Sequence, residues 1–362
     1  MKKMFLFAAF AGIALASCTT DEEIFAPVNQ GNEIEFVAAD YVHQTRGGHE
    51  QTALESGSFG VYAWPYGTDD ALMFNVEIAK NGTTWKPTGN NKYYWPDDTF
   101  VDFTAVYPYG NPAFTRVARV VTEDNEGELI STADITVEFN GTKSNPTNVN
   151  LMYADLVTQK HVYDPTDDPA ASAEAVPMLF RHLLAKLNVV VDQTDIECEG
   201  GVKSYEITLT KVAFTGLYDQ GSLTVDAAYR EAAKGDNANT IWANQDGEAT
   251  WEVFTGEQDL SGNSNKYESN ATYYVMPQKI NGTQKLEIEY TITTTFTNGT
   301  VAESQKTRTI ALNAIKTKVE NWYTNKSITY TVNISPADLE EITFTAEEEI
   351  WCEEVKGEGN IK

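Results

Sequence analysis

Alternation of apolar and polar side chains dominates this chain and predicts β-strands along most of its length. Runs rich in Val, Thr, Tyr and other aromatic residues are separated by Gly, Pro and Asn-Gly turn signals, while helical periodicity is scarce. The runs that we expect to form strands are residues 60–65, 76–79, 83–85, 92–96, 101–108, 135–139, 206–210, 223–225, 272–276, 286–292 and 327–334. Short strands with frequent turns favour an all-β fold built from sandwiches.

Two segments near opposite ends of the chain share the pattern Glu-Ile-x-Phe-x-Ala, at residues 33–38 and 341–346. Alternate side chains of a strand point to the same face. Each segment therefore presents an Ile-Phe-Ala set to one face of a sheet, namely Ile34, Phe36 and Ala38 in the first and Ile342, Phe344 and Ala346 in the second. Ile350 has the parity of the second set.

The dipeptide Arg46-Gly47 separates the first twin segment from the rest of the protein. If a protease cuts after Arg46, the first segment can leave and expose a groove shaped for Ile, Phe and Ala. The second segment of a neighbouring molecule carries the side chains to fill that groove, which is a form of β-strand addition. The alternative is that two ordinary strands resemble each other by chance.

The first residues have the features of a bacterial lipoprotein signal peptide. Lys2 and Lys3 precede a short apolar stretch over residues 4–14, which is too short to span a bilayer. The sequence Leu-Ala-Ser-Cys then ends at Cys18 and matches the lipobox. We therefore expect lipid on Cys18, which would hold the precursor on a membrane. The alternative is an ordinary signal peptide with an incidental cysteine.

The apolar run from Val176 to Val191 follows a loop rich in Asp, Pro and Ala, and we expect it to open a second domain with one long strand. The predicted organisation is a signal peptide (1–17), a lipidated segment with a removable strand (18–46), an N-terminal β-sandwich (47–175), a C-terminal β-sandwich (176–335) and a tail with a candidate donor strand (336–362).

The formal net charge of -27, from 53 acidic against 26 basic residues, argues against nucleic acid as a partner. No catalytic motif or metal spacing is present, so we expect no enzyme activity, cofactor or metal. The histidines are His43, His49, His161 and His182, and we expect the last to be a packed residue. Cys198 and Cys352 are either paired or free thiols.

The adjacent aromatic residues Tyr93, Tyr94 and Trp95 could stack on sugars. Neighbouring residues of a strand point to opposite faces, so at most Tyr93 and Trp95 share one face. We expect these residues to pack in the core. An exposed platform would instead indicate a lipid-anchored surface protein that binds glycans and does not polymerise.

The order and spacing of several segments resemble the fimbrillin family of Bacteroidetes, which comprises type V pilins and related surface lipoproteins. The resemblance lies in Cys18 with its lipobox and in residues 59–64, 92–96, 102–103, 151–154, 180–187, 274–278, 322–334 and 342–351. It implies two tandem transthyretin-like β-sandwiches, export as a lipoprotein to the outer membrane, removal of an N-terminal strand by an arginine-specific protease and assembly through a donated C-terminal strand. The implied partners are other fimbrial subunits and a host or bacterial surface receptor.

Overall fold

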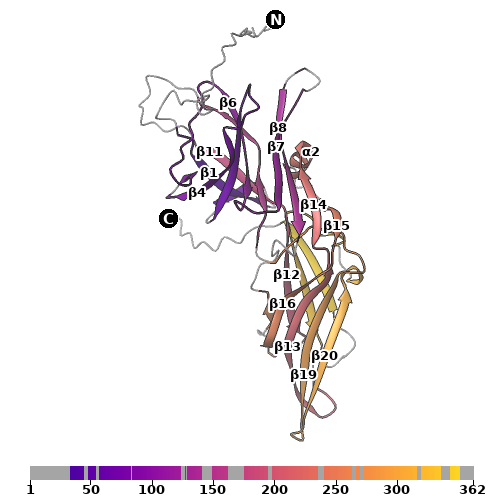
Figure 1. Ribbon diagram of the computed structural model, residues 1–362. Coiled ribbons are helices and arrows are strands. Elements are labelled where there is room, and N and C mark those ends of the chain that lie inside the picture. The colour runs from indigo at the N-terminus through magenta and orange to yellow at the C-terminus, as the bar shows by residue number, and fades with distance from the viewer. Residues whose placement is uncertain are drawn as a thin grey trace, which may run out of the picture.

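The protein is an elongated, nearly all-β molecule in which two sheet-built halves lie end to end (Figure 1). This computed structural model describes residues 33–44, 48–53, 57–82, 84–123, 127, 129–140, 149–161, 175–194, 198–234, 240–262, 266–269, 273–315, 319–335 and 343–350. The all-β prediction is confirmed. No helix in these ranges is long and apolar enough to cross a membrane.

The N-terminal half is a ring of strands closed around an aromatic core. Its sheet runs in the order β10-β6-β3-β4-β5-β1-β11-β9, with a further pairing of β6 with β9 that closes the ring. The bounds are β1 (Phe36–Gln44), β2 (Gly48–Ala53), β3 (Ser58–Pro65), β4 (Met73–Asn81), β5 (Thr84–Pro87), β6 (Phe100–Tyr107), β9 (Met152–Ala154), β10 (Val157–Lys160) and β11 (Val176–His182). The β4–β5 hairpin turns where the Asn81-Gly82 signal predicts it.

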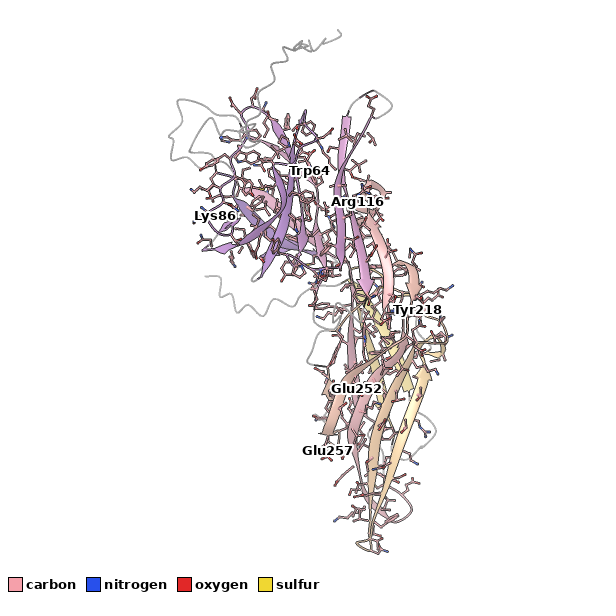
Figure 2. All side chains as sticks on the ribbon, in the orientation of Figure 1. Trp64, Lys86, Arg116, Tyr218, Glu252 and Glu257 are labelled. Atoms are coloured by element: carbon pink, nitrogen blue, oxygen red, sulfur yellow. The ribbon has the colours of Figure 1, made fainter. Side chains whose placement is uncertain are left out.

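A four-stranded sheet covers the outer face of this ring. Its order is β15-β14-β8-β7, with bounds β7 (Phe114–Glu123), β8 (Leu129–Asn140), β14 (Gln220–Val225) and β15 (Ala243–Asp246). A second apolar core lies between ring and sheet, and it joins Tyr62 and Trp64 of β3 to Ile135 and Val137 of β8. Figure 2 shows Trp64 between the two layers.

The C-terminal half is a sandwich of two sheets. One has the order β17-β12-β21-β22, with β18 also paired to β12, and the other has the order β16-β13-β19-β20. Trp322 is fully buried between them, packs against Phe214 and donates a hydrogen bond of 2.9 Å to the Tyr330 hydroxyl. The bounds are β12 (Ala185–Gln193), β13 (Val202–Leu217), β16 (Ala249–Asp259), β17 (Tyr267–Glu268), β18 (Tyr273–Val275), β19 (Lys285–Phe296), β20 (Val301–Ala311), β21 (Lys326–Ile334) and β22 (Thr343–Ile350).

The pairing of strands places the crossing between the halves later than the sequence predicts. The expected single strand over residues 176–191 is two strands, because β11 pairs with β1 and β9 in the ring while β12 pairs with β21 in the C-terminal sandwich. The chain passes from one half to the other at Leu183 and Leu184, not before Val176. Both strands are apolar, so their pattern could not tell which sheet each one joins. Strand β14, expected in the second domain, likewise pairs with β8.

Helix α2 (Ala227–Lys234), which the strand pattern did not predict, joins β14 to β15 and lies against β14 and β8 of the four-stranded sheet. It starts after Asp226, whose side chain accepts a hydrogen bond of 2.8 Å from the Tyr229 amide and so caps the helix. Alanine is frequent in the helix, which suits its intrinsic preference. Tyr229 of this helix is buried, and its burial raises the pKa of the Tyr229 hydroxyl to about 12.

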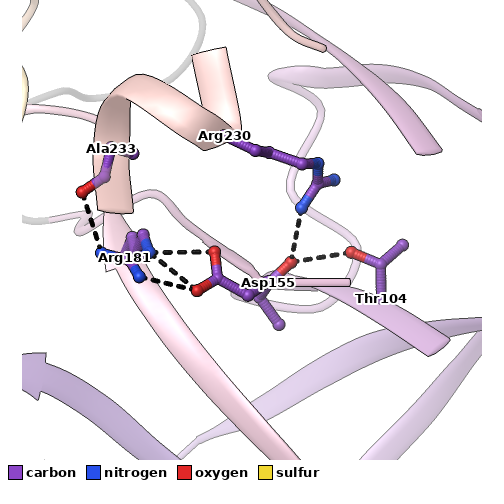
Figure 3. Close-up of polar contacts among 6 residues, drawn as sticks. Thr104, Asp155, Arg181, Arg230 and Ala233 are labelled. Carbon is purple, nitrogen blue, oxygen red and sulfur yellow. Dashed lines mark hydrogen bonds and ion pairs between the residues drawn. The ribbon is translucent and has the colours of Figure 1, made fainter. Parts of the chain in front are cut away.

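Two buried arginines fasten this helix to the ring (Figure 3). Arg230 of α2 donates to the carbonyl oxygens of Ala154, at 3.1 Å, and Ala133, at 2.9 Å. Arg181 of β11 forms an ion pair of 2.7 Å with Asp155 and donates to the Ala233 carbonyl at 3.2 Å. We call this set the arginine latch. It joins α2 to β11 and the end of β9 in the ring, and to β8 of the four-stranded sheet.

Replacing Asp155 with Asn should destabilise the protein, because Arg181 would keep its buried charge without a carboxylate partner. We expect a loss of about 3 kcal/mol in the free energy of unfolding, measured by urea denaturation. Glu268→Gln is the matched control, since it breaks the Lys266–Glu268 pair, in which both side chains are about half exposed. Its expected cost is below about 1 kcal/mol. Equal losses in the two variants would contradict a structural role for the latch.

Candidate functional site

The place that residues 33–38 occupy in the ring is the candidate site, and we call it the β1 seat. One wall is β11, whose Val176 amide donates to the Glu35 carbonyl at 2.8 Å. The other wall is β5 and the segment after it, where Phe36 lies opposite Trp85 and the Ile34 amide donates to the Tyr93 carbonyl at 2.8 Å. Backbone pairing on both sides makes this segment an interior part of the ring.

The inner face of the seated segment fills the ring core. Ile34 and Phe36 are fully buried and Ala38 is 6% exposed, as the alternation predicts. The Phe36 ring lies 6.4 Å from that of Phe59 and 6.0 Å from that of Phe103, both edge to face. Aromatic pairs in this geometry attract each other beyond the burial of their surface. The seat is therefore shaped for a large ring between two smaller side chains.

The outer face of the same segment carries two ion pairs. Lys92 Nζ lies 3.0 Å from Glu33 Oε2, and Lys86 Nζ lies 2.5 Å from Glu35 Oε1. The hydrogen bond to Glu33 raises the pKa of Lys92. Figure 2 shows Lys86 on the outer side of the N-terminal half, away from the four-stranded sheet. Sequence reasoning missed these lysines as partners, because the contact with each glutamate is made only by folding.

Beyond the seat, β1 continues into a hairpin with β2. Gln44 lies opposite Gly48 at its end. Arg46 and Gly47 belong to the short connection between these paired residues, and they lie outside the described residues, as does Cys18. The predicted cleavage site thus lies in the sequence between two strands that pair with each other.

The second twin segment lies in the other half of the molecule. Strand β22 is an edge strand of the C-terminal sandwich and pairs antiparallel with β21, with Phe344 opposite Val332 and Ile350 opposite Lys326. Ala346 packs against the C-terminal core, whereas Thr345, Glu347 and Glu348 are exposed. Ile342 lies outside the described residues. The structure does not bring the two twin segments together within one molecule.

The aromatic cluster after β5 serves packing, as predicted. Trp95 is 6% exposed, with its ring 5.4 Å from that of Phe103, and Tyr93 packs against the same core. An exposed sugar platform at this place is therefore not formed. His182 is also buried, and its Nδ1 lies 3.0 Å from Asn150 Oδ1.

The described residues hold no group of three or more His, Cys, Asp and Glu side chains suited to a metal ion. Cys198 is an exposed thiol, and Cys352 lies outside the described residues.

Comparison with solved structures shows the same fold in a fimbrial protein from Bacteroides vulgatus ATCC 8482. The identity is 18%, the TM-score is 0.52, and the match covers 89% of this chain and 100% of that chain. A protein from Bacteroides uniformis ATCC 8492, provisionally assigned to cell adhesion, matches with 16% identity and a TM-score of 0.44 over 89% of this chain and 99% of its own. No curated protein sequence matches the chain.

A family model described as fimbrillin-like matches residues 45–351, which is most of the chain. The match begins just before Gly47 and extends through β22, so it includes both walls of the β1 seat and the second twin segment but not the first. The chain therefore belongs to the fimbrillin-like family.

Proposed function

We propose that the protein is a subunit of a cell-surface fimbria that polymerises when residues 341–350 of one copy enter the β1 seat of the next. Membership in the fimbrillin-like family supports a structural, non-catalytic role at the cell surface. The observation that carries the assembly step is the seat itself, an interior place in the ring filled by a segment that precedes Arg46.

Removal of the first segment would expose apolar side chains and unpaired backbone groups of the ring to water, which is unfavourable. The ring would lose its pairing with Val176 and Tyr93, and the rings of Phe59 and Phe103 would lose their contact with Phe36. Burying one Ile or Phe side chain stabilises a protein by roughly 1.5–3 kcal/mol. A segment with Ile, Phe and Ala at alternate positions recovers that burial, and the second twin segment has these residues in the same order.

Arg46 is the position that fits the cut. It is the first arginine of the chain, and the next is Arg116. Arg116 lies within β7, where pairing with β8 protects the backbone, whereas Arg46 stands in the sequence between β1 and β2. Cleavage there frees β1 while β2 stays on the mature chain.

Strand β22 suits release from its own sandwich. Among the strands that the structure describes, it pairs with β21 alone and forms the edge of that sheet. Its exposed Thr345, Glu347 and Glu348 contribute little burial there. Moving the twin segment into an interior seat exchanges one neighbouring strand for two, which adds backbone hydrogen bonds as well as apolar burial.

We also propose that lipid on Cys18 holds the precursor at the outer membrane before the chain is cut.

Arg46→Ala should yield a folded monomer that cannot accept a partner, because β1 stays covalently attached in its seat. Incubation with an arginine-specific protease, followed by sizing chromatography, should show polymers for the parent and a monomer for the variant. Arg116→Ala is the matched control and should polymerise like the parent, since its exposed side chain lies in a paired strand. Polymer formation by Arg46→Ala would overturn the cleavage step.

Ile342→Asp combined with Phe344→Asp should block polymerisation of the cut protein, because carboxylates would enter the apolar core of the seat. Thr343→Asp with Thr345→Asp adds the same charge on the opposite parity and should still polymerise. The uncut Ile342→Asp, Phe344→Asp variant should melt close to the parent. A large drop in its melting temperature would show instead that these side chains belong permanently to the C-terminal sandwich.

A further inference from the structure

The β1 seat has an apolar floor, which is the ring core that contacts Ile34, Phe36 and Ala38. It also has a charged outer rim, formed by Lys86 and Lys92. Glu33 and Glu35 are two residues apart, so they share the outer face, and each pairs with one lysine from the same wall. Within the described part of the chain, the ion pairs of Lys92 and Lys86 are made with these two glutamates. When residues 33–46 leave, both lysines lose their carboxylates.

The two twin segments differ at one of these outer positions. Aligned in the same direction, Glu341 takes the place of Glu33, while Thr343 takes the place of Glu35. An incoming strand therefore offers a carboxylate to Lys92 and a neutral hydroxyl to Lys86. The strand that is removed makes two ion pairs in the seat, and the strand that replaces it can make one.

Neighbouring registers fit worse. Shifting the incoming strand by two residues in one direction places Glu340 in the pocket of Ile34, and the opposite shift places Glu348 in the pocket of Ala38. A buried carboxylate without a partner is costly. In the second of these registers, threonines also face both lysines. Of these three registers, only the one with Glu341 beside Lys92 both places apolar side chains in the pockets and gives a lysine of the rim a carboxylate.

Resting on the proposed function, we infer that Lys92 selects the register of the incoming strand by pairing with Glu341 of the neighbouring copy. The occupant is thus residues 341–346 of a second copy. A lysine on the rim also suits a chain whose net charge of -27 makes its copies repel each other, because it offers a local attraction to an acidic segment.

The test uses two one-sided proteins that can form only a heterodimer. The acceptor is the cut chain with Ile342→Asp and Phe344→Asp, which keeps an open seat but cannot donate. The donor is the uncut Arg46→Ala chain, which keeps its tail but has a filled seat. The dissociation constant of the heterodimer is measured by titration of a labelled acceptor with donor, and melting curves confirm that each variant is folded.

Lys92→Glu in the acceptor should weaken the heterodimer by about three- to tenfold, since an attractive pair becomes a repulsive one at the sheet surface. Glu341→Lys in the donor should restore the binding lost in that acceptor. Lys86→Glu is the matched control and should change the dissociation constant by less than about twofold, because it faces a neutral Thr343.

Unchanged binding by the Lys92→Glu acceptor, or no recovery with the Glu341→Lys donor, would overturn the role of Lys92 while leaving strand donation intact. Equal losses for Lys92→Glu and Lys86→Glu would also overturn it, since a general charge effect would explain both. If the parent acceptor and donor form no heterodimer, the proposed function fails and this inference fails with it.

Discussion

Closure of the N-terminal ring depends on a strand between β5 and β11. Residues 33–38 supply its backbone pairing at Tyr93 and Val176, and Phe36 fills the ring between Phe59 and Phe103. Buried backbone groups must be paired, and an open sheet edge invites another strand. The ring is closed in this structure because residues 33–38 fill the place, and the proposed assembly rests on exchanging that strand for another.

The arginine latch would hold β11 in position during an exchange of strands in the ring. Strand β11 forms one wall of the seat, and Arg181 near its end is held by Asp155 and by the last turn of α2. Arg230 binds the carbonyl of Ala154 on the neighbouring strand. These contacts come from the side away from β1, so they remain when β1 is gone. A wall anchored in this way keeps the pockets in position for the next strand.

Electrostatics and burial have different roles in the assembly that we propose. The acidic surface keeps copies apart at long range, so contact must be specific and short-ranged. Burial in the apolar part of the seat supplies most of the stabilisation of a bound strand. Any strand with a similar alternation of apolar side chains can obtain it. The charged rim at Lys86 and Lys92 adds little energy, because it is partly exposed, yet it distinguishes one register from another.

Local pattern was sufficient to predict the all-β class, most strands and the inward face of residues 33–38, because alternation reports directly which side chains are buried. The tertiary structure decided which strands pair. The apolar run over residues 176–191 did not indicate that β11 joins the ring while β12 joins the other half. Both strands are apolar and buried, so their patterns are alike. Helix α2 is short and depends on Asp226 and on buried Arg230, which no periodicity reveals. Glu33 and Lys92 are 59 positions apart, and only folding brings their charges together.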